Sequence, residues 1–213
     1  RQLEEEANRE IEKAKREIMA GNIIVNEHAV TKAGKNFKDD EELLIRVKDR
    51  LKYVSRGGLK LEKAIEVWNL DFSDKTVLDI GASTGGFTDC ALQNGAKKVY
   101  SVDVGTNQLD WKLRNDSRVI SIENTHIKDL KPENLENEKV DFTVIDVSFI
   151  SLTKVIPYLR KFLKDKGKVI MLIKPQFEVG KEKIGKNGIV MEEQYHDEAI
   201  KKIISFSWES GYE

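Results

Sequence analysis

The first fifty residues carry apolar positions that change from a helical to a strand-like spacing. Over residues 2–20 they recur every three or four residues, which predicts an amphipathic helix that ends at Gly21-Asn22. Short apolar pieces separated by polar turns follow at Ile23–Val25, Ala29–Val30 and Leu43–Val47. We therefore predict a small α+β unit, a helix followed by a twisted sheet.

From Leu59 onward, apolar runs of strand length alternate with helical patterns. A helix is predicted around Leu61 to Trp68, where Trp68, like Trp111 further on, is interpreted as a packing residue. The predicted strands are Thr76–Ile80, Lys98–Asp103, Val119–Ile122, Val140–Val147 and Lys168–Ile173, with crossover helices at Phe87–Gln93, Gln108–Arg114 and Ser151–Leu163. This alternation predicts a doubly wound, mostly parallel α/β sheet that binds ligands beyond the carboxyl ends of its strands.

The amino-acid composition argues against a membrane-spanning protein, a disulfide-rich protein and a protein with a local metal site. No apolar run approaches the roughly eighteen residues of a membrane span, so no membrane partner is expected. The chain has one cysteine, and its three histidines are far apart in sequence, which argues against a disulfide framework and a local metal site. We expect a cytoplasmic protein without a metal.

Charge is balanced overall, at a net of −1, but it is uneven along the chain. Between residues 44 and 63, seven basic residues face two acidic ones. Such a stripe is either a solvated face or a contact for nucleic-acid phosphates. Arg46, Lys48, Arg50 and Arg56 are its candidate RNA-binding residues.

A glycine-rich turn joins the first strand of the predicted sheet to its helix. The segment runs from Asp79 to Phe87, and the next strand ends on Asp103, an acid placed to accept hydrogen bonds from ribose hydroxyls. The spacing differs from the dinucleotide motif because Ser83 stands where the second glycine would be. Asp79 would repel a pyrophosphate but suits the cationic end of S-adenosylmethionine, so we favour this cofactor over a tight turn without a ligand. The candidate cofactor-binding residues are Asp79, Gly81, Ser83, Gly85, Gly86 and Asp103.

Asp146 and Lys174 finish two later strands at the same predicted edge. A charge at the end of a buried strand needs a partner, and each can serve the other, either as a structural ion pair or as a functional one. A lysine can accept or share the proton of a ribose 2′-hydroxyl while its charge stabilises the developing alkoxide. The segment Ser55–Lys60 can supply a second lysine. The segment Asp146-Val147-Ser148-Phe149 also resembles the acid-x-x-aromatic motif of amino-group methyltransferases, in which an aromatic ring stacks on a flipped base. Methyl transfer to an amino group is therefore a second, weaker interpretation of this segment.

Four sequence blocks resemble the haemolysin A (TlyA) proteins, S-adenosylmethionine-dependent ribosomal RNA 2′-O-methyltransferases of the FtsJ-like superfamily. They are Tyr53–Lys60, Asp79–Thr88, Asp146–Ser151 and Lys174–Gly180. The resemblance implies a Rossmann-like methyltransferase sheet and places three members of a Lys-Asp-Lys-Glu tetrad on Lys60, Asp146 and Lys174. It also implies a cofactor site at Gly81, Gly85 and Asp103, and cytidine in ribosomal RNA or ribosomal subunits as substrate.

The segment Ala14–Asn26 is similar to the RNA-binding domain of ribosomal protein S4, which adds Lys15 and Arg16 to the candidate RNA contacts. The expected domains are residues 1–48 for RNA binding, 49–58 as a basic linker and 59–213 for methyl transfer. The first helix of the small domain and the glutamate-bearing strands of the large one are expected outside this sequence. A membrane-active haemolysin and a non-catalytic RNA-binding protein remain alternative functions.

Overall fold

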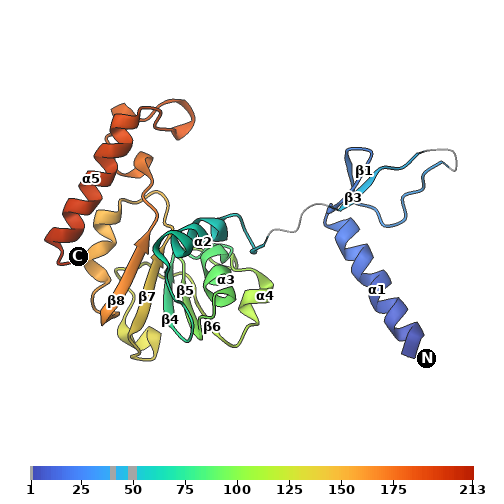
Figure 1. The fold of residues 1–213 in the computed structure, drawn as a ribbon, viewed down its shortest axis with the longest axis horizontal. Coiled ribbons are helices and arrows are strands. Elements are labelled where there is room, and N and C mark those ends of the chain that lie inside the picture. Colours follow the sequence, from blue (N-terminus) through green and yellow to red (C-terminus); the bar gives the residue numbers. More distant parts are fainter. Residues whose placement is uncertain (1, 39–41, 48–51) are drawn as a thin grey trace. The chain divides into compact units, whose positions relative to one another are not determined.

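The chain forms two compact units, Arg1–Leu51 and Lys52–Glu213, in a computed structural model that describes residues 2–38, 42–47 and 52–213 (Figure 1). The first unit contains the helix α1 (Gln2–Met19) and the strands β1 (Ile23–Val25), β2 (His28–Val30) and β3 (Ile45–Val47). These strands form an antiparallel sheet in the order β2-β1-β3, which confirms the predicted helix and small sheet.

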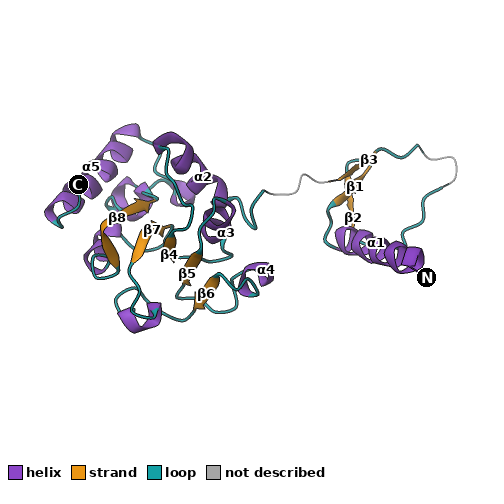
Figure 2. Cartoon of the chain, turned by 60° about the horizontal axis from the view of Figure 1, so that its bottom comes forward, coloured by secondary structure: helices purple, strands orange, loops and turns teal. Residues whose placement is uncertain are grey.

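The second unit is built on a five-stranded sheet in the order β6-β5-β4-β7-β8, and Figure 2 shows the strands in this sequence. All four pairings are parallel, and the strands are rich in β-branched residues, as expected for a buried parallel sheet. The predicted doubly wound sheet is therefore confirmed. Its strands are β4 (Thr76–Ile80), β5 (Lys98–Val102), β6 (Val119–Ile122), β7 (Val140–Ile145) and β8 (Leu163–Met171).

Apolar cores cover both faces of this sheet. One core contains Leu61, Cys90 and Val77 and brings α2 (Gly57–Trp68) and α3 (Gly86–Gln93) onto the sheet. The other contains Ile145, Ile156 and Ile203 and carries short 3-10 turns and α5 (Glu193–Glu209). The remaining elements are α4 (Trp111–Arg114) and the 3-10 turns η1 (Pro132–Leu135), η2 (Leu152–Lys154), η3 (Ile156–Tyr158), η4 (Pro175–Phe177), η5 (Lys181–Lys183) and η6 (Lys186–Gly188).

The predicted crossover helix at Ser151–Leu163 is wrong. The segment folds as η2 and η3, because Pro157 has no N–H to donate and its ring would collide with a carbonyl one turn earlier in a continuous helix. The helix predicted from Gln108 begins only at Trp111, after Asp110, whose side chain accepts a hydrogen bond from the Lys112 N–H.

The packing role assigned to two tryptophans is also wrong. Trp68 is 63% exposed and Trp111 is 77% exposed. Both sit on helices whose buried face is carried by other residues, Leu61 in α2 and Leu113 in α4. Residues 52–58, the described part of the predicted linker, belong to the second unit, where Tyr53 is buried and the Val54 N–H donates to Asp89.

Candidate active site

The loop between β4 and α3 is shaped by a glycine that a larger residue could not replace without strain. Gly81 has φ +81°, and a Cβ added to it would lie 2.8 Å from the backbone oxygen of Asp146. The backbone of β4 therefore approaches the end of β7 as closely as sterics allow.

Asp103 holds this loop through its carboxylate. One oxygen accepts a hydrogen bond from the Ser83 N–H and the other from the Gly105 N–H, both at 2.7 Å. Each carboxylate oxygen can accept more than one hydrogen bond, so Asp103 retains acceptor capacity for a ligand. The residue predicted to meet a ribose thus also fixes the glycine loop.

The two glycines at the start of α3 meet protein atoms. A Cβ on Gly85, which has φ +96°, would overlap Leu113, and a Cβ on Gly86 would overlap Ser55 and Gly58. A side chain is therefore excluded at Gly85 by the packing of α4 and at Gly86 by the packing of the segment at the start of α2. Gly86 also lines a cavity described below.

Asp79 lies fully buried at the centre of the sheet. Its Oδ2 accepts a hydrogen bond of 2.7 Å from the Thr88 hydroxyl, and its Oδ1 has no hydrogen-bond partner among the described residues. Burial raises the pKa of Asp79 to about 7, with the Thr88 hydrogen bonds acting in the opposite direction. The Asp79 side chain therefore supports the glycine loop through α3 and does not line either of the two cavities described below.

Lys60, Asp146 and Lys174 come together although they are far apart in the sequence. Lys60 Nζ lies 3.2 Å from Asp146 Oδ2, and Lys174 Nζ lies 2.6 Å from Asp146 Oδ1. Lys174 also donates a hydrogen bond of 2.8 Å to the Ser148 hydroxyl. One carboxylate thus holds two ammonium groups, in the arrangement that the sequence predicts for the three tetrad members.

Two cavities open at this edge of the sheet. The larger, of about 1200 Å³, extends from the glycine loop past Asp103 to Phe149 and Lys154. The smaller, of about 190 Å³, contains Lys174 in its wall together with residues of the segment before α2. Both are lined by Gly81, Ser83, Asp146 and Ser148. The carboxylate of the ion-pair cluster therefore faces both cavities, whereas Lys174 lines only the smaller one.

An aromatic side chain stands at the rim of the larger cavity. Phe149 is 92% exposed and has φ +63°, a conformation that is rare for a bulky residue. Its ring lies 5.3 Å from that of Phe177, at an interplanar angle of 50°. Backbone strain of this kind is concentrated at functional sites.

The predicted RNA-binding residues lie in different surroundings. Lys15 pairs with Glu12 at 2.8 Å and Arg46 with Glu27 at 2.7 Å, so their charges are partly balanced on the surface. Arg16 and Arg56 are exposed, and Arg56 precedes α2 without an acidic partner in the described part of the chain. Lys48 and Arg50 lie outside the described residues.

The sequence does not predict two residues that contribute to the site, Ser148 and Glu178. Ser148 is not predicted as a partner of Lys174, and Glu178 is predicted only as part of a sequence block. Glu178 is buried at the end of η4 and accepts hydrogen bonds from Ser151 and Leu152. A glutamate directly after Phe177 is a weak signal of such burial.

Across residues 2–38, 42–47 and 52–213, no cluster of three or more His, Cys, Asp or Glu side chains is placed to hold a metal ion. In the same part of the chain, no helix has both the length and the apolar character needed to cross a bilayer.

The strand order, the glycine loop after β4 and the charged cluster after β7 define a methyltransferase with a Rossmann-like sheet. The chain belongs to the FtsJ-like methyltransferase family, whose model matches residues 53–213.

Individual relatives extend this similarity to nearly the whole chain. YqxC of Bacillus subtilis, which carries the name of an rRNA methyltransferase, is 51% identical over 94% of this chain and 71% of its own length. The 16S/23S rRNA (cytidine-2′-O)-methyltransferase TlyA of Mycobacterium tuberculosis is 37% identical over 92% of this chain and 72% of its own length. A solved structure from Streptococcus thermophilus, described as a haemolysin, is 49% identical, with a TM-score of 0.75 over 94% of this chain and 73% of that one. The resemblance to the haemolysin A (TlyA) proteins is confirmed.

Proposed function

We propose that this chain transfers a methyl group from S-adenosylmethionine to a ribose 2′-hydroxyl of cytidine in ribosomal RNA. The observation that carries the proposal is the Asp146 carboxylate, which lies in the wall shared by the two cavities and forms ion pairs with Lys60 and with Lys174. The TlyA relative named above, an rRNA (cytidine-2′-O)-methyltransferase, supports the same choice of acceptor.

The glycine loop fits the proposed cofactor. Gly81 leaves room where a Cβ would meet the Asp146 backbone, and Asp103 lines the larger cavity with acceptor capacity for ribose hydroxyls. Ser83 and Gly86 line the smaller cavity, and Gly85 and Asp79 support the loop. When bound, S-adenosylmethionine supplies an electrophilic methyl group on a sulfonium.

The chain's own residues would handle the proton of the acceptor. Methylation of a hydroxyl breaks its O–H bond and releases one proton. The proposed acceptor of that proton is Lys174 Nζ as the free amine, which becomes an ammonium group on accepting it. Asp146 orients this ammonium group from 2.6 Å, and Ser148 fixes it from a second side at 2.8 Å. Lys60 would add positive charge beside the developing alkoxide.

RNA would be held through phosphates. We propose the first unit as an RNA-binding domain of the S4 type, with Lys15, Arg16 and Arg46 on its surface and Arg56 at the start of α2 as contacts. Lys48 and Arg50 are proposed from sequence alone. Phosphate contacts weaken steeply as salt is raised, because the free energy gained by releasing counterions from the RNA becomes smaller at high salt concentration.

The Phe149 ring offers an exposed surface for stacking on the target base. No observation on the described residues favours a membrane-active haemolysin or a cofactor-free RNA-binding protein over methyl transfer.

The test is a tritiated-methyl transfer assay on ribosomal subunits, followed by mapping of the modified nucleotide. Lys174→Ala should lower the rate by about 10²–10⁴-fold, the usual contribution of a positioned acid or base, while binding of S-adenosylmethionine measured by calorimetry persists. Lys166→Ala, an exposed lysine of β8, is the control. Equal rates for the two variants would remove Lys174 from the mechanism, and absence of cofactor binding by the parent chain would overturn the proposed function.

A further inference from the structure

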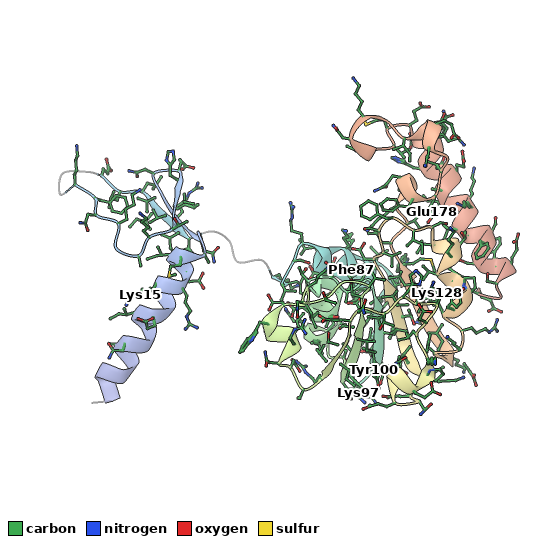
Figure 3. The ribbon with its side chains drawn as sticks, turned by 180° about the vertical axis from the view of Figure 1, so that it is seen from behind. Lys15, Phe87, Lys97, Tyr100, Lys128 and Glu178 are labelled. Carbon is green, nitrogen blue, oxygen red and sulfur yellow. The ribbon has the colours of Figure 1, made fainter. Side chains whose placement is uncertain are left out.

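Glu178 is a buried carboxylate that the proposed chemistry does not use. Its side chain is 1% exposed, and a charge in that position is stable only with several partners. Oε1 accepts a hydrogen bond of 2.8 Å from the Leu152 N–H, and Oε2 accepts one of 2.6 Å from the Ser151 hydroxyl. Lys202 Nζ of α5 lies 3.3 Å from Oε2 and donates to the Glu178 backbone oxygen at 2.7 Å. Figure 3 labels Glu178 beside the ribbon of α5.

These contacts attach one short segment to the loop of the ion-pair cluster at two points. The loop runs from Asp146 to Leu152, and the segment from Lys174 to Glu178. Lys174, at the start of the segment, binds Asp146 and Ser148 near the start of the loop. Glu178, at the end of the segment, binds Ser151 and Leu152 at the end of the loop. The loop therefore has little freedom to shift relative to the lysine that it faces.

Phe149 lies between the two points of attachment. Its left-handed backbone conformation is unfavourable for a bulky residue, and such a conformation persists only when its surroundings impose it. Phe149 has no burial to offset that energy, since it is 92% exposed and contacts Phe177 of the same 174–178 segment. The hydrogen bonds that fix both ends of the loop supply the constraint.

We propose that Glu178 is a positioning residue that holds the Asp146–Leu152 loop in its strained form, with Lys202 as its counter-ion. Through this ion pair, α5 becomes a structural part of the site, although it adds no side chain to either cavity at the glycine loop. The catalytic consequence rests on the function proposed above, whereas the effect on the loop does not.

Kinetics test the catalytic consequence. Glu178→Gln keeps the shape of the side chain but removes the charge and one acceptor, so the Ser151 end of the loop and Phe149 would be held less firmly. We expect kcat to fall on the order of 10-fold to 100-fold with an unchanged Kd for S-adenosylmethionine, because small displacements of reacting groups have effects of this size. Lys202→Met should act in the same direction, and Lys201→Met, at the neighbouring exposed position, should leave kcat unchanged. An unchanged kcat in Glu178→Gln would overturn the catalytic role.

A spin label tests the loop without any turnover. The only cysteine, Cys90, is buried, so Phe149→Cys in a Cys90→Ala background gives one exposed labelling position. The electron paramagnetic resonance spectrum should show a restrained nitroxide, and adding Glu178→Gln or Lys202→Met should make it more mobile at unchanged helix content by circular dichroism. The same line shape in all three chains would refute the positioning role. This readout stays valid if the chain proves inactive on ribosomal RNA, so the two failures can be told apart.

Discussion

Replacing Gly81 with alanine tests whether the glycine loop owes its shape to the close approach of β4 and β7. The φ of +81° is one that L-residues adopt at a cost of about 1–2 kcal/mol. The new methyl group would also lie 2.8 Å from the Asp146 oxygen and 3.1 Å from Val147 Cγ1, and overpacking of this kind costs about 1–3 kcal/mol. The free energy of unfolding should therefore fall by about 2–5 kcal/mol, the sum of these two costs.

Gly188→Ala separates the two contributions. Gly188 has φ +73°, but nothing lies within 4 Å of the position that its new methyl group would take, so only the conformational strain applies. Urea unfolding followed by circular dichroism should show a larger loss for Gly81→Ala than for Gly188→Ala. Because relief of the overlap displaces the backbone of Asp146, methyl transfer should fall in Gly81→Ala alone. Equal stability losses and equal rates in both variants would refute the reasoning.

Two further predictions concern the carboxylates around the loop. Asp103→Ala removes the acceptor of two backbone N–H groups and should weaken S-adenosylmethionine binding by roughly 1–3 kcal/mol, about fivefold to 150-fold; an unchanged Kd in calorimetry would contradict this. Asp79 has a folded-state pKa of about 7, above the 3.8 of a free carboxyl, so the folded chain keeps a proton that the unfolded chain has lost between these pH values. The free energy of unfolding should therefore decrease as pH rises from about 4 to 7, by up to about 1.4 kcal/mol per unit, and then level off. Asp79→Asn should flatten this dependence, whereas Asp165→Asn, at an exposed position, should preserve it.

Much of the sheet is predictable from the sequence because its strands are buried on both faces. Thr76–Ile80 and Val119–Ile122 are predicted with the bounds that the structure gives. Continuous β-branched runs of this length have few other stable arrangements. Asp146 and Lys174 follow β7 and β8, which are adjacent parallel strands, so topology brings the two residues to one edge of the sheet.

Features that depend on contacts between distant residues were not predictable in the same way. The turns at η2 and η3 look helical by apolar spacing, and only Pro157 signals otherwise. The exposure of Trp68 and Trp111 depends on which helix face meets the sheet, which spacing alone does not decide for short helices. The burial of Glu178 requires Ser151 and Lys202 to converge on it from 27 and 24 residues away.

The wall formed by Gly81, Ser83, Asp146 and Ser148 has a thermodynamic consequence, because it borders two cavities at once. A molecule that shifts this wall from one side changes the shape offered on the other side. Binding equilibria linked in this way are reciprocal, so the factor by which RNA changes the affinity for the cofactor equals the factor by which the cofactor changes the affinity for RNA. Under the proposed function, we expect substitutions among these four residues to change the affinities for both the cofactor and the RNA.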